Sequence, residues 1–198
     1  MIAALYVETG GAYYGDGSIE PWDEERDARR YGGPYPVVAH PPCARWCMLA
    51  SVNEARWGAM IGDDGGTFAA ALHAVRTYGG VLEHPAYSIA WDWFGLPKPG
   101  RHGWTGALDD PGWSTEVSQV AYGHAARKRT WLYAVGCTLP KLDWTEPAAD
   151  AVIGNGVHTG QATNRPKLSN TLYTPAAFRD VLTSMARTVE RGRPGCRR

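Results

Sequence analysis

The chain has 198 residues, of which 44% are hydrophobic, and its 20 acidic and 20 basic side chains give a formal net charge of zero. This length predicts one domain with a substantial core. Zero net charge argues against a protein that binds nucleic acid through bulk charge, because such binding depends on neutralising phosphates. The four cysteines form no paired framework and every apolar run is far shorter than a membrane span. We therefore expect a cytoplasmic protein without a membrane partner.

Short apolar runs along the chain predict the strands of a sheet. Continuous apolar strands that alternate with helical segments are typical of parallel sheets with both faces covered. We therefore expect a Rossmann-like, mainly parallel α/β sheet flanked by helices, in a single compact domain that spans residues 1–190. The apolar runs lie at residues 2–7, 36–39, 81–83, 115–121 and 130–135.

One predicted helix carries start and stop signals. Residues 68–76 have apolar side chains at helical spacing, Asp63 or Asp64 is a plausible N-cap before them, and Gly79-Gly80 closes the segment. The other expected segments are helices at 44–57 and 174–189, a Gly- and Tyr-rich loop at 13–21, a short charged helix or turn at 23–31, a Trp- and Gly-rich loop or flap at 91–113, and a basic, disordered tail at 191–198.

The most informative stretches are two predicted strand ends, PVVAHPPC at residues 36–43 and VLEHP at residues 81–85. Ligands of open α/β sheets bind beyond the carboxyl ends of the strands. A thiol, Cys43, and a carboxylate, Glu83, fall at these two ends. Attack on C6 of cytosine or uracil requires this pair, because the thiolate adds to the ring while a carboxyl group near N3 stabilises the developing charge. The sequence therefore predicts a pyrimidine-modifying site.

These motifs resemble those of the C5-cytosine DNA methyltransferases. Pro41-Pro42-Cys43 is similar to their nucleophile loop, and Glu83-His84-Pro85 resembles their Glu-Asn-Val or Glu-Asn-Pro strand end. Two further elements follow in the family's order, so that the resemblance covers roughly residues 35–190. The stretch 119–133 resembles the arginine-bearing strand of small phage members, and Thr174-Pro175 with Phe178 resembles the start of their closing helix.

The resemblance implies a role for each matching residue. Cys43 would be the nucleophile, Glu83 the partner of N3, and Arg127 and Arg129 the arginines that contact base and phosphate. It also implies DNA or a pyrimidine nucleotide as substrate and the cytoplasm of a bacterial host as location. We expect substrate contacts from His40, Pro42, His84, Pro85 and Gln119, and contacts to the cofactor S-adenosylmethionine from Glu8, Gly10 and Gly11.

The chain departs from the family where the cofactor binds. No aromatic residue followed by Gly-x-Gly follows the first predicted strand, where Glu8-Thr9-Gly10-Gly11 stands instead. The family's second strand, whose acidic end holds the cofactor ribose, is expected to be deleted or collapsed into residues 23–27. No region is large enough for a full target-recognition domain, so a partner protein is a candidate source of target recognition.

Other interpretations stay open. One is a non-catalytic DNA- or nucleotide-binding module of the same fold, for example a phage factor for DNA protection or anti-restriction. Another is an enzyme that modifies free pyrimidine nucleotides without S-adenosylmethionine. His40, Cys43, Cys47 and His84 offer zinc ligands, but a zinc deaminase needs His-x-Glu and Pro-Cys-x-x-Cys, and neither pattern occurs. We therefore expect no metal.

Two smaller features also have two interpretations each. The basic run 127–129 either contacts nucleic acid or forms a turn that faces water. A group of tryptophans either stacks on an extruded base, as in single-strand binders, or forms a hydrophobic cap over the core. The tryptophans are Trp91, Trp93, Trp104 and Trp113.

Overall fold

The computed structural model describes residues 1–48, 50–58, 60–153, 166–168 and 173–190. A seven-stranded sheet with strand order β2-β1-β3-β4-β7-β6-β5 forms the centre of the domain. The predicted tail at 191–198 lies outside the described residues. The strands are β1 (Ile2–Leu5), β2 (Ile19–Trp22), β3 (Val37–Ala39), β4 (Gly80–Pro85), β5 (Thr105–Gly106), β6 (Trp113–Ser118) and β7 (Arg129–Val135).

The sheet is mixed rather than mainly parallel. The strands β2, β1, β3 and β4 run parallel to one another, whereas β7, β6 and β5 add to β4 by antiparallel pairing. Only residues 119–128 connect β6 to β7, and a parallel pair needs a longer crossover, usually a helix. The single α/β domain is confirmed, and the expected parallel arrangement holds for the first half of the sheet.

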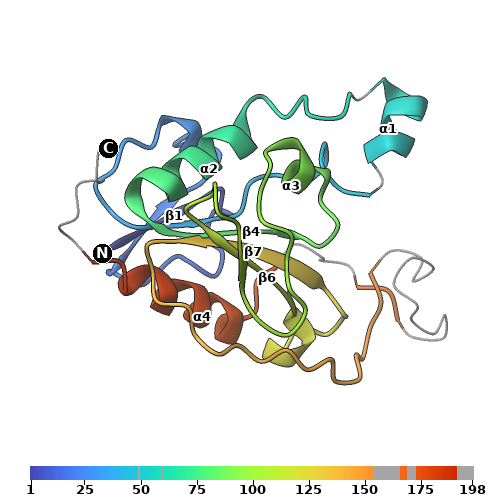
Figure 1. Cartoon of the computed structure of the whole chain (residues 1–198). Coiled ribbons are helices and arrows are strands. Elements are labelled where there is room, and N and C mark those ends of the chain that lie inside the picture. Colours follow the sequence, from blue (N-terminus) through green and yellow to red (C-terminus); the bar gives the residue numbers. More distant parts are fainter. Residues whose placement is uncertain (49, 59, 154–165, 169–172, 191–198) are drawn as a thin grey trace.

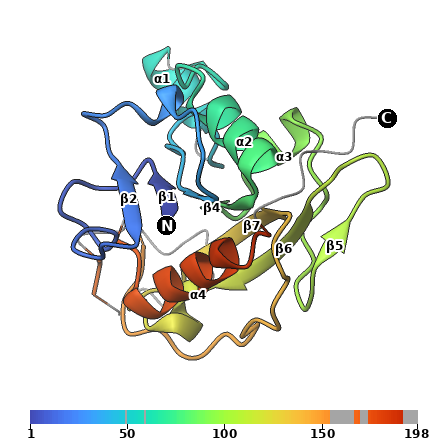
Figure 2. The same cartoon turned by 90° about the vertical axis from the view of Figure 1, so that its left-hand side faces the viewer.

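Helices cover both faces of the sheet, as Figures 1 and 2 show. The helices α2 (Thr67–Tyr78) and α3 (Ile89–Trp93) lie on one face, where Phe68, Val75 and Leu82 contribute to the core. The helix α4 (Ala176–Arg187) lies on the other, with Phe178 and Leu182 in a second core cluster. The remaining helices are α1 (Ala50–Trp57) and the 3-10 helices η1 (Ala28–Arg30) and η2 (Gln119–Tyr122).

The two ends of α2 follow the sequence signals in part. Gly66 occupies the N-cap position, but the Asp64 carboxylate still accepts hydrogen bonds from the backbone amides of Gly66 and Phe68, both in or next to the first turn. Gly79 is the C-cap, with φ of 75°. The next residue, Gly80, has to be small, because a Cβ there would lie 1.9 Å from the carbonyl oxygen of Val37 on β3. This contact lets β4 pair closely with β3.

Several elements differ from the sequence-based expectation. β2 begins inside the predicted loop 13–21, and its Pro21 is tolerated because β2 is an edge strand of the sheet. The predicted helix 44–57 begins only at Ala50, and β5 lies within the predicted loop 91–113. None of the helices in the described part of the chain is long and apolar enough to cross a membrane.

Candidate functional site

The carboxyl ends of the parallel strands meet at one edge of the sheet. β1 lies between β2 and β3. The chain passes from β1 to β2 on one side and then crosses to β3 on the other side of β1. Such a reversal of strand order marks the crevice in which ligands bind in open α/β sheets. His40 directly follows β3, and Glu83 lies near the carboxyl end of the adjacent β4.

Four polar side chains form a connected group at this edge, which we call the site cluster: Tyr13, His40, Glu83 and Gln119. His40 Nδ1 lies 2.9 Å from Glu83 Oε2, and His40 Nε2 lies 2.7 Å from the Tyr13 hydroxyl. Gln119 Nε2 donates to Glu83 Oε1 at 3.2 Å and to the hydroxyl of Thr130 at 2.9 Å. Both carboxylate oxygens of Glu83 therefore have a partner in the protein.

Glu83 is an ionised group in a buried position, with 7% of the residue exposed. Burial by itself raises the pKa of this carboxyl group. The hydrogen bond from His40, the charge of a protonated His40 and the charge of Lys128 outweigh burial, and together they lower the pKa of Glu83 to about 2. The ion pair with His40 exists only while that imidazole is protonated. The carboxylate thus depends on its neighbours to remain charged.

Cys43 lies in a tight turn just after β3. The backbone amides of Trp46 and Cys47 both donate to the Cys43 carbonyl oxygen at 2.9 Å, so the turn is closed by main-chain bonds. The residue is half-buried, and burial is the main cause that raises the pKa of its thiol, followed by its interactions with the Cys47 thiol and the Glu83 carboxylate. Because Ala39 pairs with Leu82, the chain segments that carry Cys43 and Glu83 leave the sheet at the same end.

His84 lies on the opposite side of β4 from Glu83, because alternate residues of a strand face opposite sides of the sheet. Its ring packs edge-on to Phe68 at 5.2 Å, beside Trp91, and the residue is 0% exposed. Neither ring nitrogen has a hydrogen-bond partner of good geometry among the described residues. The Pro42 backbone raises the pKa of His84, but its effect is smaller than that of burial. Burial lowers the pKa of His84 to about 4. His84 is therefore a core residue in this structure, out of reach of a substrate.

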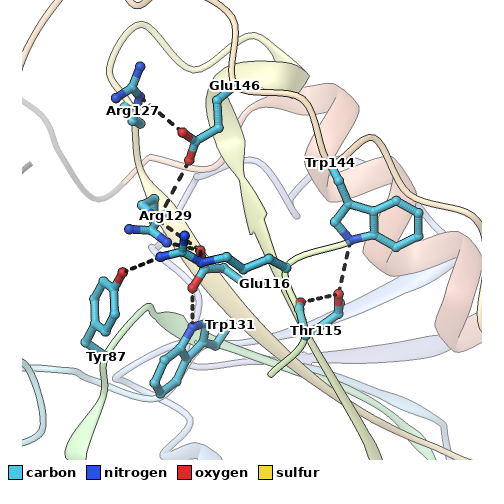
Figure 3. A network of polar contacts seen from close by, with 10 residues as sticks. Tyr87, Thr115, Glu116, Arg127, Arg129, Trp131, Trp144 and Glu146 are labelled. Carbon is cyan, nitrogen blue, oxygen red and sulfur yellow. Dashed lines mark hydrogen bonds and ion pairs between the residues drawn. The ribbon is translucent and has the colours of Figure 1, made fainter. Parts of the chain in front are cut away.

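The arginines predicted to contact base and phosphate are paired with carboxylates (Figure 3). Arg129 contacts Glu116, which also accepts a hydrogen bond from Trp131 Nε1 at 2.8 Å. Glu146 lies 3.7 Å from Arg129 and 3.9 Å from Arg127. We call Glu116, Arg127, Arg129, Trp131 and Glu146 the arginine cluster. Arg129 also lies over the ring of Tyr87, 5.0 Å from its centroid.

The arginine cluster and the site cluster lie on different faces of the sheet. Arg129 and Trp131 alternate with Thr130, and Thr130 shares Gln119 with Glu83. The same alternation places Lys128 on the side of Thr130, and its positive charge lowers the pKa of both Glu83 and Cys43. Lys128 is therefore the cation of this basic run that acts on the site. The alternation of faces along residues 127–130 is the sequence signal that could have separated Lys128 from Arg127 and Arg129.

The region predicted to hold the cofactor contains an additional acidic group. Glu8 is exposed after β1, and the backbone amide of Gly11 donates to its carbonyl oxygen at 2.9 Å. A second strand, β2, is present where a deletion was expected, since it runs parallel to β1 and ends just before Asp23. Asp23 accepts hydrogen bonds from the hydroxyls of Tyr14 at 2.5 Å and Thr9 at 2.8 Å, and these bonds lower its pKa to about 2. The strand was missed because it is short and contains proline.

The remaining predicted residues are distributed as follows. Pro42 is exposed and Pro85 is half-buried, both beside the site cluster in sequence. Within the described residues, no three His, Cys, Asp or Glu side chains lie close enough to hold a metal ion. The tryptophans do not act as one group, because Trp91 belongs to the core under α2 and α3, whereas Trp104 packs against the core under α4.

Comparisons with family models, with curated proteins and with solved structures give no match to this chain.

Proposed function

We propose that the protein is a pyrimidine-modifying enzyme that holds the base between Cys43 and Glu83 and bonds the Cys43 sulfur to C6 of the ring. The favoured reaction is methyl transfer to C5 of cytosine in DNA. One observation carries this proposal: Cys43 lies in the turn after β3, and Glu83 lies near the carboxyl end of β4, the neighbouring parallel strand. The switch point beside β1 and β3 supports a Rossmann-like class for this half of the sheet.

The residues around the base have different roles in the proposed reaction. The Cys43 thiol has to lose its proton before it attacks, and Lys128 is the positive charge that favours the thiolate against the effect of burial. Gln119, which also donates to the Thr130 hydroxyl, holds the carboxyl group of Glu83 in place beside N3 of the base. Because the carboxyl group is fixed in advance, little reorganisation is needed as charge develops on the ring.

S-adenosylmethionine is the proposed methyl donor, and the residues after β1 and β2 fit its polar half. Asp23 is an ionised carboxylate at the end of β2, and Glu8 is an exposed carboxyl group at the end of β1. Glycines at 10 and 11 leave bare backbone between them. A hydroxyl of the ligand would share Asp23 with Thr9 and Tyr14. When bound, the cofactor supplies an electrophilic methyl group.

A covalent trap tests this proposal. After the methyl group has bonded to C5, release of Cys43 requires loss of the atom that C5 carried before, and fluorine cannot leave as a cation, so the adduct persists and is seen by mass spectrometry. With S-adenosylmethionine present, we expect the protein to form a stable complex with an oligonucleotide that contains 5-fluorodeoxycytidine, and Cys43→Ser to form none. Cys137→Ser is the matched control, since that thiol lies 3.7 Å from the Gly80 carbonyl oxygen at the other end of β4. Failure to trap, with and without S-adenosylmethionine, contradicts the proposal.

The arginine cluster favours a second candidate, an enzyme for free nucleotides, over a non-catalytic DNA-binding module. Arg127 and Arg129 already contact Glu116 and Glu146, so less positive charge is directed at a phosphate backbone. A partner protein would then supply target recognition, in the cytoplasm of a bacterial host. Tighter binding of a deoxycytidine nucleotide than of an oligonucleotide would favour the nucleotide enzyme. Oligonucleotide binding that Cys43→Ser leaves unchanged, without an adduct, would favour the module.

A further inference from the structure

A chain of hydrogen bonds joins Glu83 to a buried tyrosine through His40. The Tyr13 hydroxyl lies 2.7 Å from His40 Nε2, and His40 Nδ1 lies 2.9 Å from Glu83 Oε2. On the other side of the carboxyl group, Gln119 holds Oε1. Tyr13, Glu83 and Gln119 are buried, so water competes little for these bonds.

This chain accepts an additional proton without moving any heavy atom. With Glu83 ionised and His40 neutral, the Nδ1–H group donates to Glu83 and Nε2 accepts the Tyr13 hydroxyl hydrogen. When His40 gains a proton, Nε2–H donates to the Tyr13 oxygen and the bond to Glu83 is kept. These two contacts keep Glu83 ionised, with a pKa of about 2, until a base whose N3 needs a donor draws the Nδ1 proton onto Glu83 Oε2 and leaves a carboxylic acid bonded to a neutral imidazole. Glu83 can therefore present either protonation state.

Cytosine and uracil need opposite protonation states at N3. In cytosine N3 is a hydrogen-bond acceptor, and it gains negative charge when a thiolate adds at C6, so it requires a proton donor. In uracil N3 carries a hydrogen and donates it to an acceptor. A carboxylic acid at Glu83 suits the first base and a carboxylate suits the second.

We propose that His40 is a positioning residue whose proton decides which of the two bases Glu83 accepts. This inference rests on the proposed binding of a pyrimidine at Glu83. For cytosine, the thiolate pair of Cys43 forms the S–C6 bond, the C5–C6 π pair moves to C4–C5, and the C4–N3 π pair takes a proton at N3. Glu83 gives that proton, and His40 Nδ1 replaces it on the carboxyl group. Without the proton on His40, Glu83 stays a carboxylate and favours uracil.

The other charged groups near Glu83 do not replace His40 in this role. Burial raises the pKa of Glu83, whereas Lys128 lowers it and so favours the carboxylate. His84 is neutral near pH 7, because burial lowers its pKa to about 4. The Cys43 thiol, once it is ionised, is negatively charged and would raise the pKa of Glu83. Of the described groups that face Glu83, only His40 has a hydrogen-bond partner on each of its two ring nitrogens and so is satisfied in both protonation states.

The groups around Tyr13 leave its hydroxyl protonated, as the chain requires. Burial is the main cause that raises the pKa of Tyr13, and the charge of Glu83 raises it further. From α4, Arg179 lowers this pKa and Asp180 raises it, so their effects oppose each other. Tyr13 therefore acts as a hydrogen-bond partner for His40 in both states and not as a source of the proton.

Equilibrium binding of deoxycytidine and deoxyuridine monophosphates across pH 5–8 tests the inference without any covalent step. We expect the preference for the cytosine nucleotide to rise as pH falls, by up to about tenfold per pH unit within the titration. His40→Asn keeps a donor near the position of Nδ1 but cannot carry a proton, so its preference should not change with pH. Glu83→Gln is the second variant, and its isosteric amide should also abolish the dependence.

The outcomes separate this inference from the proposed function. A preference that does not depend on pH in the native protein, or a dependence that survives in folded His40→Asn, overturns the role of His40. The same holds if neither nucleotide binds. If the dependence is present and disappears in folded His40→Asn, the role of His40 is supported even when Cys43 forms no adduct, and only the enzymatic proposal then fails. Thermal unfolding of each variant shows whether it is folded.

Discussion

The site cluster and the arginine cluster lie on different faces of the sheet and differ in how their charges are balanced. In the site cluster, Glu83 is held by one titratable group, His40, and one neutral group, Gln119. In the arginine cluster, Arg129 is held by two carboxylates, Glu116 and Glu146. The first arrangement changes charge with protonation, whereas the second is balanced between permanent charges. We infer that the first serves chemistry and the second mainly serves structure.

The largest expected effect concerns His84, which follows Glu83 on β4 but belongs to the apolar core. Its pKa is about 4 in the folded chain against an ordinary 6.5, so the unfolded state binds more protons between these values. Stability therefore falls as pH falls from 6.5 to 4, by about 3 kcal/mol in total. Chemical denaturation at each pH measures this loss. His84→Phe should flatten the curve of stability against pH, because a phenyl ring cannot be protonated. The phenyl ring also suits the contacts that the imidazole makes with Phe68 and Trp91.

The exposed His73 on α2 provides the control for this comparison. His73→Phe makes the same chemical change where the ring is open to water, so the pH dependence should stay as in the native protein. The low pKa of Glu83 contributes only at lower pH, since its stabilisation is lost as pH falls from 4.5 toward about 2. An unchanged curve in His84→Phe would show that the buried imidazole is not the cause.

A smaller effect is expected when the balanced pair in the arginine cluster is broken. Glu116→Gln removes the nearest negative charge from Arg129, and we expect it to cost about 2 kcal/mol of unfolding free energy. The cost is moderate because about a quarter of the Arg129 side chain is exposed and water screens it. Glu24→Gln, at an exposed position after β2, is the control and should change stability by less than about 0.5 kcal/mol. Equal losses in both variants would mean that Glu116 has no structural role.

The smallest expected effect is a gain in oligonucleotide binding by Glu146→Gln. Glu146 is the more exposed carboxylate of the arginine cluster, and exposed ion pairs contribute at most about 1 kcal/mol. We expect the affinity for a short oligonucleotide to rise by about twofold to fivefold, and the salt dependence to steepen by less than about one ion. Salt titrations of binding measure both quantities. Should Glu24→Gln produce the same gain, the cause is the change in overall charge and not Glu146.

Much of the candidate site could be predicted because its signals are local. Apolar runs that end in stiff, polar turns identified β3 and β4, and with them Cys43 and Glu83. Helical spacing and a glycine stop identified α2. β2 escaped prediction because a four-residue edge strand with a proline has neither alternation nor a long apolar run. The ion pair of Arg129 with Glu116 escaped it as well, because the two residues meet only through the pairing of β6 with β7.

The sequence by itself determined β3, β4 and α2, and that Cys43 and Glu83 stand at or near the ends of the two strands. It did so because burial and turn formation depend mainly on neighbouring residues. Only the tertiary structure decided that the second half of the sheet is antiparallel, that Lys128 and not Arg129 acts on Glu83, and that His40 is the partner of that carboxylate. These outcomes depend on strand order and on which face a residue takes, and both are fixed by contacts between distant parts of the chain.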